Sequence, residues 1–389
     1  MPDLMFPAPP LYQLVANPAF SPGVYGGEEV MPVAMMDEAE AVITRWPGYA
    51  PTPLVSLPEL ARACGVRQLL YKDESKRFGL GSFKALGGAY AVAALVASHQ
   101  QQGGAIGDLT VTTATDGNHG RSVAWGAQQA GCRAEIYIHA HVSHERQAAM
   151  EAFGARVHRI DGNYEASLAA CKDDAEANNW TIVSDTSWEG YSKIPQMVMA
   201  GYSLIGREVL AQLETGCSLS HCFLPVGVGG LAAGIVAPLW HALGTNLPLI
   251  TTVESHYSAC FLESIAAGKP SLVSITEETV MAGLSCGEVS DLAWQLLQPV
   301  LHHCMAIGDD AVAPLMAALA DGSGGAAALE AGECATAGIA ALLAARQQED
   351  GGKALQLDAD SVVLVIGTEG ATDPRLYASM LAEGRARRG

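Results

Sequence analysis

A single lysine stands where a glycine-serine turn passes into a run of small residues. Lys84 ends the segment GLGSFK (79–84) and is followed by ALGGAYAV (85–92). A lysine amine held at the start of a helix can form a Schiff base with a carbonyl compound. The small residues after it are typical of a helix packed closely against a sheet. The same short pattern also fits a surface lysine after a turn, so the chemistry needs support from other segments.

Two later loops supply that support. The strand-like VTTA (111–114) leads into TDGNHG (115–120) and then into a helical pattern from Arg121, and CFLP (222–225) leads into VGVGG (226–230). Free N–H groups at a helix start bind anions, and glycine lets the backbone approach a phosphate closely. Each loop alone is also compatible with an ordinary glycine turn.

The spacing of the second loop excludes two common nucleotide sites. GVGG (227–230) lacks the G-x-G-x-x-G pattern of dinucleotide binding, and no Lys-Ser pair follows it as in a P-loop. Binding of a dinucleotide or a nucleoside triphosphate is therefore disfavoured.

The elements around these loops alternate between strands and helices, which predicts an α/β fold with two domains. We expect strands near 109–113, 134–138 and 156–160, and the run SVVLVI (361–366) is typical of a buried parallel strand. Three histidines at 139–144 follow one of these strands. We expect a solvated loop there rather than a metal site.

The three loops, in this order, resemble those of the fold-type II family of pyridoxal-phosphate enzymes, which includes threonine and serine dehydratases. The resemblance spans about residues 45–375, with PTPL (51–54) and SFK (82–84) matching family motifs. It implies twisted, mostly parallel sheets flanked by helices. It also implies that Lys84 carries pyridoxal 5′-phosphate as a Schiff base and that Phe83 packs beside the cofactor ring.

The remaining cofactor contacts are carried over from the same resemblance. Asn118 would hydrogen-bond the ring oxygen, and Thr368 would face the pyridine nitrogen. A neutral hydroxyl there would leave that nitrogen largely unprotonated. The phosphate-binding loop would consist of Gly227, Val228, Gly229 and Gly230.

Four motifs resemble one branch of this family, the diaminopropionate ammonia-lyases. They are TDGNHGR (115–121), DTSWEGY (185–191), MAGLSCGE (281–288) and GTEGATDP (367–374). The resemblance implies α,β-elimination of 2,3-diaminopropionate to pyruvate and two molecules of ammonia. Lys84, freed by the substrate amine, would act as the base.

Asp116 and Asp185 give this choice of substrate a physical reason. Diaminopropionate carries a second ammonium where serine and threonine carry a neutral hydroxyl, so a facing carboxylate discriminates between them. Asp116 is also a candidate base on the second face of the substrate, because the family accepts both stereoisomers. A helix N-cap is the alternative role for Asp116.

The resemblance also predicts the domain arrangement. Residues 1–86 and 194–389 would form a large cofactor-binding domain, and residues 87–193 a small inserted domain. The active site would lie between them, with Asp116 and Asn118 contributed by the small domain. The family is commonly dimeric, so a homodimer is expected.

Charge and cysteine content limit the partners and the compartment. A net charge of −19 opposes binding to nucleic acid or to an anionic membrane surface. The first residues lack the basic and apolar pattern of a signal peptide, so a cytoplasmic enzyme is expected. Nine cysteines without a C-x-x-C pair fit reduced thiols, with pairing of Cys260 and Cys286 left open.

Two other functions remain compatible with these residues. A threonine or serine dehydratase would use the same cofactor and Lys84, although only about 19 residues follow Gly370, too few for a regulatory domain. A non-catalytic protein that binds pyridoxal phosphate is the alternative from another class. The intact lysine and loops argue against it, and release of pyruvate would separate the two.

Overall fold

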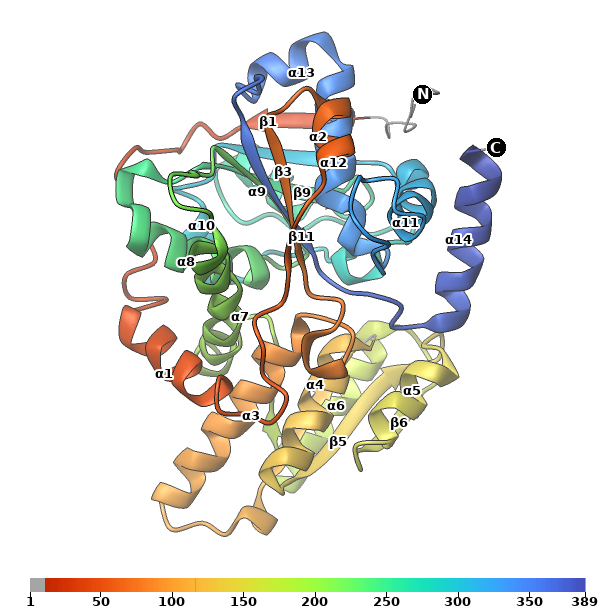
Figure 1. Ribbon diagram of the computed structural model, residues 1–389. Helices are drawn as coiled ribbons and strands as arrows, with labels where there is room; N and C mark the ends of the chain where they lie inside the picture. The colour runs from red at the N-terminus through yellow and green to blue at the C-terminus, as the bar shows by residue number, and fades with distance from the viewer. Residues whose placement is uncertain (1–10, 116, 389) are drawn as a thin grey trace.

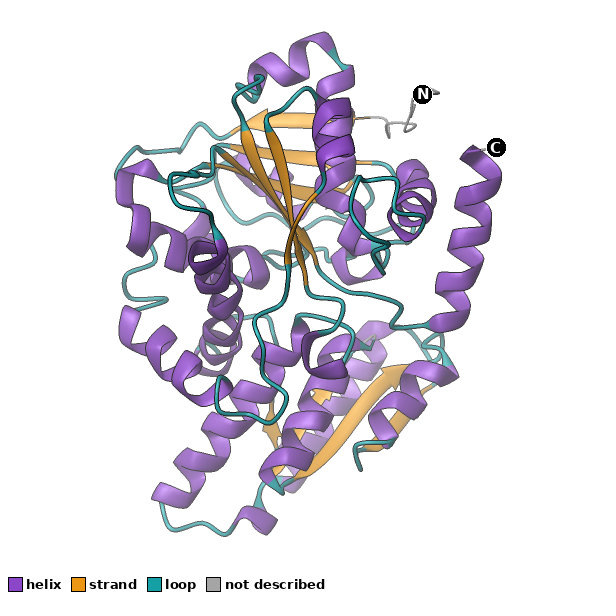
Figure 2. Cartoon of the chain, viewed as in Figure 1, coloured by secondary structure: helices purple, strands orange, loops and turns teal. Residues whose placement is uncertain are grey.

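Two separate sheets form the frame of the molecule. The computed structural model describes residues 11–115 and 117–388. In Figure 1 the larger sheet occupies the upper half and the smaller one the lower half, and Figure 2 shows helices packed against each. Within the described residues, no helix combines the length and the apolar character needed to cross a bilayer. The sheets and their helices confirm the predicted α/β class.

The larger sheet has seven strands in the order β1-β10-β9-β8-β11-β3-β2. The two edge strands run antiparallel to their neighbours, and the inner pairs are parallel. The strands are β1 (Leu11–Ala16), β2 (Leu54–Ser56), β3 (Gln68–Asp73), β8 (His221–Pro225), β9 (Leu249–Ser255), β10 (His303–Ile307) and β11 (Val362–Gly367). Parallel inner strands place the carboxyl ends of β3, β8 and β11 at one edge, where the loops that follow them meet.

The smaller sheet has four parallel strands in the order β6-β5-β4-β7. They are β4 (Thr110–Ala114), β5 (Arg133–His139), β6 (Arg156–Ile160) and β7 (Thr181–Ile182). Three of them lie within one or two residues of the predicted positions. The short β7 was not predicted, because two residues are too few to show the alternation of apolar and polar residues that indicates a strand.

Helices cover both sheets. They are α1 (Val33–Ile43), α2 (Pro58–Cys64), α3 (Lys84–Gln101), α4 (Asn118–Ala130), α5 (His144–Glu151), α6 (Tyr164–Asn178), α7 (Lys193–Gln212), α8 (Gly230–Leu243), α9 (Cys260–Ala267), α10 (Asp291–Leu297), α11 (Val312–Ala320), α12 (Ala337–Gln347), α13 (Glu349–Ala354) and α14 (Pro374–Arg388). In Figure 1, α3 to α6 lie around the smaller sheet, whereas α14 runs along the side of the larger one.

Strand β11 shows how the core is divided. Val362, Leu364 and Ile366 belong to the apolar cluster that includes α7 and α8, whereas Val363 and Val365 belong to the cluster that includes α11 and α12. Successive side chains of a strand point to opposite faces, so a strand buried on both faces needs a continuous apolar run. This explains why SVVLVI contains no polar residue after its first serine.

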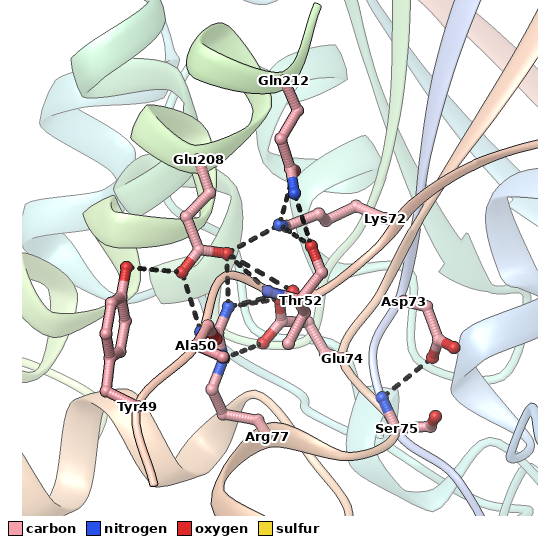
Figure 3. A network of polar contacts seen from close by, with 10 residues as sticks. All are labelled: Tyr49, Ala50, Thr52, Lys72, Asp73, Glu74, Ser75, Arg77, Glu208 and Gln212. Atoms are coloured by element: carbon pink, nitrogen blue, oxygen red, sulfur yellow. Dashed lines mark hydrogen bonds and ion pairs between the residues drawn. The ribbon is translucent and has the colours of Figure 1, made fainter. Parts of the chain in front are cut away.

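A buried network of charged side chains lies behind the turn that leads to Lys84 (Figure 3). We call Lys72, Glu74, Arg77 and Glu208 the ionic cluster; each side chain is at most 3% exposed. Glu208 on α7 accepts hydrogen bonds from Lys72 Nζ at 2.6 Å and from two nitrogens of Arg77 at 2.8 Å. The cluster joins α7 to the end of β3 and to the turn that follows it.

Two cations and two carboxylates balance the charge of the ionic cluster. Arg77 makes two further bonds to Glu74, and Lys72 Nζ also donates to the carbonyl of Thr52 and to Gln212. The Lys72 ammonium therefore uses all three of its donors. Removing one partner of such a buried set leaves a charge without compensation.

Candidate active site

The Lys84 turn is fixed by backbone hydrogen bonds to the loop that follows β11. The Phe83 N–H donates to the carbonyl of Thr368 at 3.0 Å, and the Gly370 N–H donates to the carbonyl of Gly81 at 2.9 Å. Gly81 has a φ of +76°, a conformation that favours glycine. Lys84 is the first residue of α3, as predicted. The two loops are therefore held side by side at the carboxyl edge of the larger sheet.

Lys84 forms an ion pair with Asp185. Lys84 Nζ donates to Asp185 Oδ2, and the two side chains are 21% and 24% exposed. Asp185 lies in the loop after β7 of the smaller sheet, so the pair joins loops from both sheets. His119 Nδ1 lies 3.9 Å from Asp185 Oδ2, while its other ring nitrogen is 2.8 Å from the carbonyl of Val183.

The charges of this group depend on one another. Burial opposes the ammonium, but the neighbouring Asp185 outweighs it and holds the pKa of Lys84 above its ordinary value. Burial likewise opposes the carboxylate, yet Lys84 and then His119 keep the pKa of Asp185 well below its usual range. Burial lowers the pKa of His119. The site thus presents an ammonium, a carboxylate and a neutral imidazole at neutral pH.

The third glycine loop offers four unpaired backbone donors. It connects β8 to α8, and none of the hydrogen bonds of the described residues uses the N–H of residues 227, 228, 229 or 230. The carbonyl of Val228 instead accepts from Ser290 at 2.9 Å. A Cβ on Gly227 would lie 2.8 Å from Cys286 Sγ, and one on Gly229 would lie 2.5 Å from the Phe261 ring. Gly229 also has a φ of +98°. Only glycine fits these two positions, and the free N–H groups form an anion-binding nest.

Helix α4 begins at Asn118, three residues before the predicted start. The Thr115 hydroxyl accepts hydrogen bonds from the N–H groups of Gly117 at 3.0 Å and Gly120 at 3.1 Å, which stabilises the early start. Asn118 therefore occupies the first helical position beside His119. Asp116, predicted as a base and a specificity residue, lies outside the described residues.

Phe83 directly precedes Lys84, and Thr368 lies in the neighbouring loop after β11. The Phe83 ring centroid is 5.6 Å from Lys84 Nζ. Thr368 is 2% exposed, and its Oγ1 makes no hydrogen bond of normal geometry with the described residues. Burial and then Glu333 raise the pKa of the neighbouring Glu369 carboxyl to about 7, while Thr368 lowers it.

Cys260 and Cys286 both lie beside the glycine loop, and neither forms a disulfide. Cys260 Sγ donates to the carbonyl of Gly227 at 3.5 Å. Burial raises the pKa of Cys260, so this thiol stays protonated. The pairing that the sequence left open is absent from this structure.

Two residues of the site were missed by the sequence interpretation. No role was assigned to His119 from the DGNHG motif, although a histidine beside the start of a helix could have indicated one. Tyr202 on α7 gave no signal, because it lies in the middle of a helix far along the chain from Lys84. Its ring packs against Phe83 with centroids 4.9 Å apart, and its hydroxyl is buried without a partner.

The site has the chemistry to hold pyridoxal phosphate. An amine for the carbonyl, four free N–H groups for the phosphate and an unpaired buried hydroxyl at Thr368 for the ring nitrogen lie on neighbouring loops. Buried polar atoms without partners are rare in folded proteins and need an explanation. A polar ligand provides one.

The model of the family described as "Pyridoxal-phosphate dependent enzyme" matches residues 45–367. The diaminopropionate ammonia-lyase of Escherichia coli K12 is 38% identical over 353 residues, covering 87% of this chain and 89% of that protein. The biosynthetic L-threonine dehydratase of the same organism is 30% identical over 270 residues, covering 68% of this chain and 47% of that protein.

A solved structure extends the match to the whole fold. The crystal structure of holo diaminopropionate ammonia-lyase from Escherichia coli superposes with a TM-score of 0.90 at 34% identity, covering 98% of this chain and all of that one. The geometry of the lysine and glycine loops agrees with this match. The chain belongs to the family of pyridoxal-phosphate dependent enzymes, alongside the diaminopropionate ammonia-lyases.

Proposed function

We propose that this protein catalyses the α,β-elimination of 2,3-diaminopropionate to pyruvate and two molecules of ammonia, with pyridoxal phosphate as its cofactor. The observation that carries this proposal is the contact between Lys84 and Asp185. It places a carboxylate beside the amine that would hold the cofactor. The relatives named diaminopropionate ammonia-lyase support the same substrate.

The residues that would hold the cofactor follow from the site. Lys84 would bind its carbonyl carbon, Phe83 would pack beside the ring and Asn118 would contact the ring oxygen. The N–H groups of residues 227–230 would bind the phosphate, and the Thr368 hydroxyl would face the ring nitrogen. When bound, pyridoxal phosphate supplies an electron sink for the charge that develops at the substrate α-carbon.

Asp185 would select the substrate. In the structure it holds the ammonium of Lys84, so its position and charge suit a second ammonium once the Lys84 nitrogen is engaged elsewhere. We assign the β-ammonium of diaminopropionate to it. Serine and threonine bring only a neutral hydroxyl, which leaves the carboxylate without a counter-charge.

Proton transfer would use Lys84 and Asp116. Lys84 Nζ would take the α-proton on one face of the substrate, and Asp116 would serve the second face. His119, whose ring is held by the carbonyl of Val183, would lie beside Asp185 in this arrangement. These roles extend the elimination to both stereoisomers.

We further propose two domains with boundaries at residues 1–86 and 194–389 for the large one and 87–193 for the small one. Helix α3 crosses the first boundary and would connect the two domains.

We also propose a reducing compartment such as the cytoplasm, because none of the nine cysteines forms a disulfide. We also propose a homodimer, which sedimentation of the purified protein would test.

Pyruvate release tests the reaction directly. Purified protein is supplied with D- or L-2,3-diaminopropionate, serine or threonine, and pyruvate is measured over time. We expect diaminopropionate to exceed serine and threonine in kcat/KM by about 10- to 1000-fold. A better rate with serine or threonine would instead support a dehydratase. Cofactor binding without pyruvate from any substrate would indicate a non-catalytic protein.

A further inference from the structure

Tyr202 has a buried hydroxyl that the proposed reaction does not use. The residue is 1% exposed, and its hydroxyl has no hydrogen-bond partner among the described residues. A buried hydroxyl without a partner loses its hydrogen bonds to water and gains none in return. Such a group is either tolerated as a defect or kept for a ligand.

The ring of Tyr202 fits only because glycines surround it. A Cβ on Gly234 would lie 2.7 Å from the Cβ of Tyr202, and one on Gly87 would lie 2.4 Å from Cε1 and 2.6 Å from Cζ. A Cβ on Gly230 would lie 3.9 Å from Cε2. The side chain of Tyr202 therefore extends from the second turn of α8, where its Cβ lies, to the first turns of α8 and α3, where its ring lies.

The starts of two helices lie beside the ring of Tyr202. Helices α3 and α8 both begin beside this ring, and the N-terminus of a helix carries a partial positive charge. Phe83 connects the ring to the reactive lysine, since it packs on Tyr202 and lies 5.6 Å from Lys84 Nζ. Burial raises the pKa of Tyr202, so the phenol keeps its proton as a donor.

We propose that the Tyr202 hydroxyl donates a hydrogen bond to the phosphate group of pyridoxal phosphate, in addition to the N–H groups of residues 227–230. This assignment rests on the proposed function, because it requires pyridoxal phosphate as the cofactor. It adds one side-chain donor, from α7, to the backbone N–H groups that would bind the phosphate. It gives the unpaired hydroxyl its partner.

The test compares Tyr202→Phe with a matched control, Tyr71→Phe. The Tyr71 hydroxyl is also buried and unpaired, but Tyr71 belongs to the apolar cluster on the other face of the larger sheet. Cofactor-free protein is titrated with pyridoxal phosphate and, separately, with pyridoxal, which lacks the phosphate. We expect Y202F to weaken the binding of pyridoxal phosphate about 10- to 100-fold, because one hydrogen bond to a charged group is lost. Pyridoxal binding should stay unchanged, and Y71F should change neither affinity.

Thermal unfolding of the cofactor-free proteins gives a second readout. Both variants remove an unsatisfied hydroxyl, so neither should lower Tm. The proposal is overturned if Y202F binds pyridoxal phosphate as tightly as the wild type does. It is also overturned if Y202F loses as much affinity for pyridoxal as for pyridoxal phosphate. Failure of the wild type to release pyruvate would overturn the proposed reaction, whereas a loss of affinity specific to the phosphate would still support Tyr202.

Discussion

Lys72 and Lys84 lie on the same stretch of chain, yet their surroundings differ in every respect. Lys72 is fully buried and donates three hydrogen bonds, to Glu208, Thr52 and Gln212. Lys84 is 21% exposed and donates to one partner among the described residues, Asp185. Burial lowers the pKa of Lys72 despite its carboxylate neighbours, whereas Asp185 raises that of Lys84.

The difference separates a structural lysine from the lysine to which we assign the reaction. Around Lys72 each charged group has an opposite charge within hydrogen-bonding distance, so the ionic cluster has no donor to spare. Near Lys84 the hydroxyls of Tyr202 and Thr368 are buried and have no hydrogen-bond partner in the part of the chain that the structure describes. Unsatisfied polar atoms near a partly exposed amine mark the place where a ligand completes the structure.

Lys84→Ala should have the largest effect. Activity toward diaminopropionate is expected to fall about 10³- to 10⁴-fold, because both the cofactor attachment and the base are lost. Pyruvate release measures the loss, and Tm should change little because the ion pair is partly exposed. Lys84→Arg is the matched variant, since it keeps the cation beside Asp185 but cannot form the covalent bond. Substantial activity in either variant would contradict the role of Lys84.

Glu208→Gln should affect stability rather than the reactive amine. The change leaves Lys72 and Arg77 buried with only Glu74 to balance them, so the free energy of unfolding should fall by about 3–5 kcal/mol. Urea denaturation measures it. The double variant K72M/E208Q restores the charge balance and should recover part of this loss. An unchanged free energy in E208Q would show that the ionic cluster contributes nothing to stability.

Asp185→Asn should change the choice of substrate. The kcat/KM for diaminopropionate is expected to fall about 10- to 1000-fold, because the β-ammonium loses its counter-charge, while that for serine falls less. Asp37→Asn is the control, since Asp37 forms an exposed ion pair with Arg207 and should leave both values unchanged. Equal losses for both substrates in D185N would remove Asp185 from substrate selection.

Glu369→Gln should have the smallest effect. It should raise the free energy of unfolding, whereas Glu208→Gln should lower it. Glu369 is buried and has Glu333, not a cation, as its charged neighbour, so its pKa is raised from 4.5 to about 7. The unfolded chain ionises first as the pH rises, and wild-type stability should fall between about pH 4.5 and 7. At pH 8 the variant should be more stable by about 1–3 kcal/mol. Denaturation at pH 8 and pH 4 measures the difference, which should vanish at pH 4.

The sequence predicted the local parts of this site well. Lys84 begins a helix as expected, because a glycine turn before small residues is a signal contained in a few neighbouring positions. The strand at 361–366 was predicted within one residue, because burial on both faces needs a continuous apolar run. Such features depend on neighbours along the chain and can be read directly.

The contacts across the site could not be read in this way. Lys84 and Asp185 are 101 positions apart and meet only because the loops of two sheets face each other. Tyr202 and Glu208 lie within one helix whose sequence does not show which face packs on α3. Their burial follows from tertiary packing, which local propensity does not encode.

The backbone pairing between the Lys84 turn and the Thr368 loop has a consequence for how the enzyme can diversify. Both loops extend from strands of one sheet, so the spacing between the reactive amine and Thr368 is set by main-chain bonds that side-chain replacement leaves intact. Asp185 lies in the loop after β7 of the smaller sheet, and His119 lies in the first turn of α4, which follows β4 of that sheet. If Asp185 selects the substrate as we propose, mutations there would alter substrate preference over evolutionary time while the proposed cofactor site is inherited unchanged.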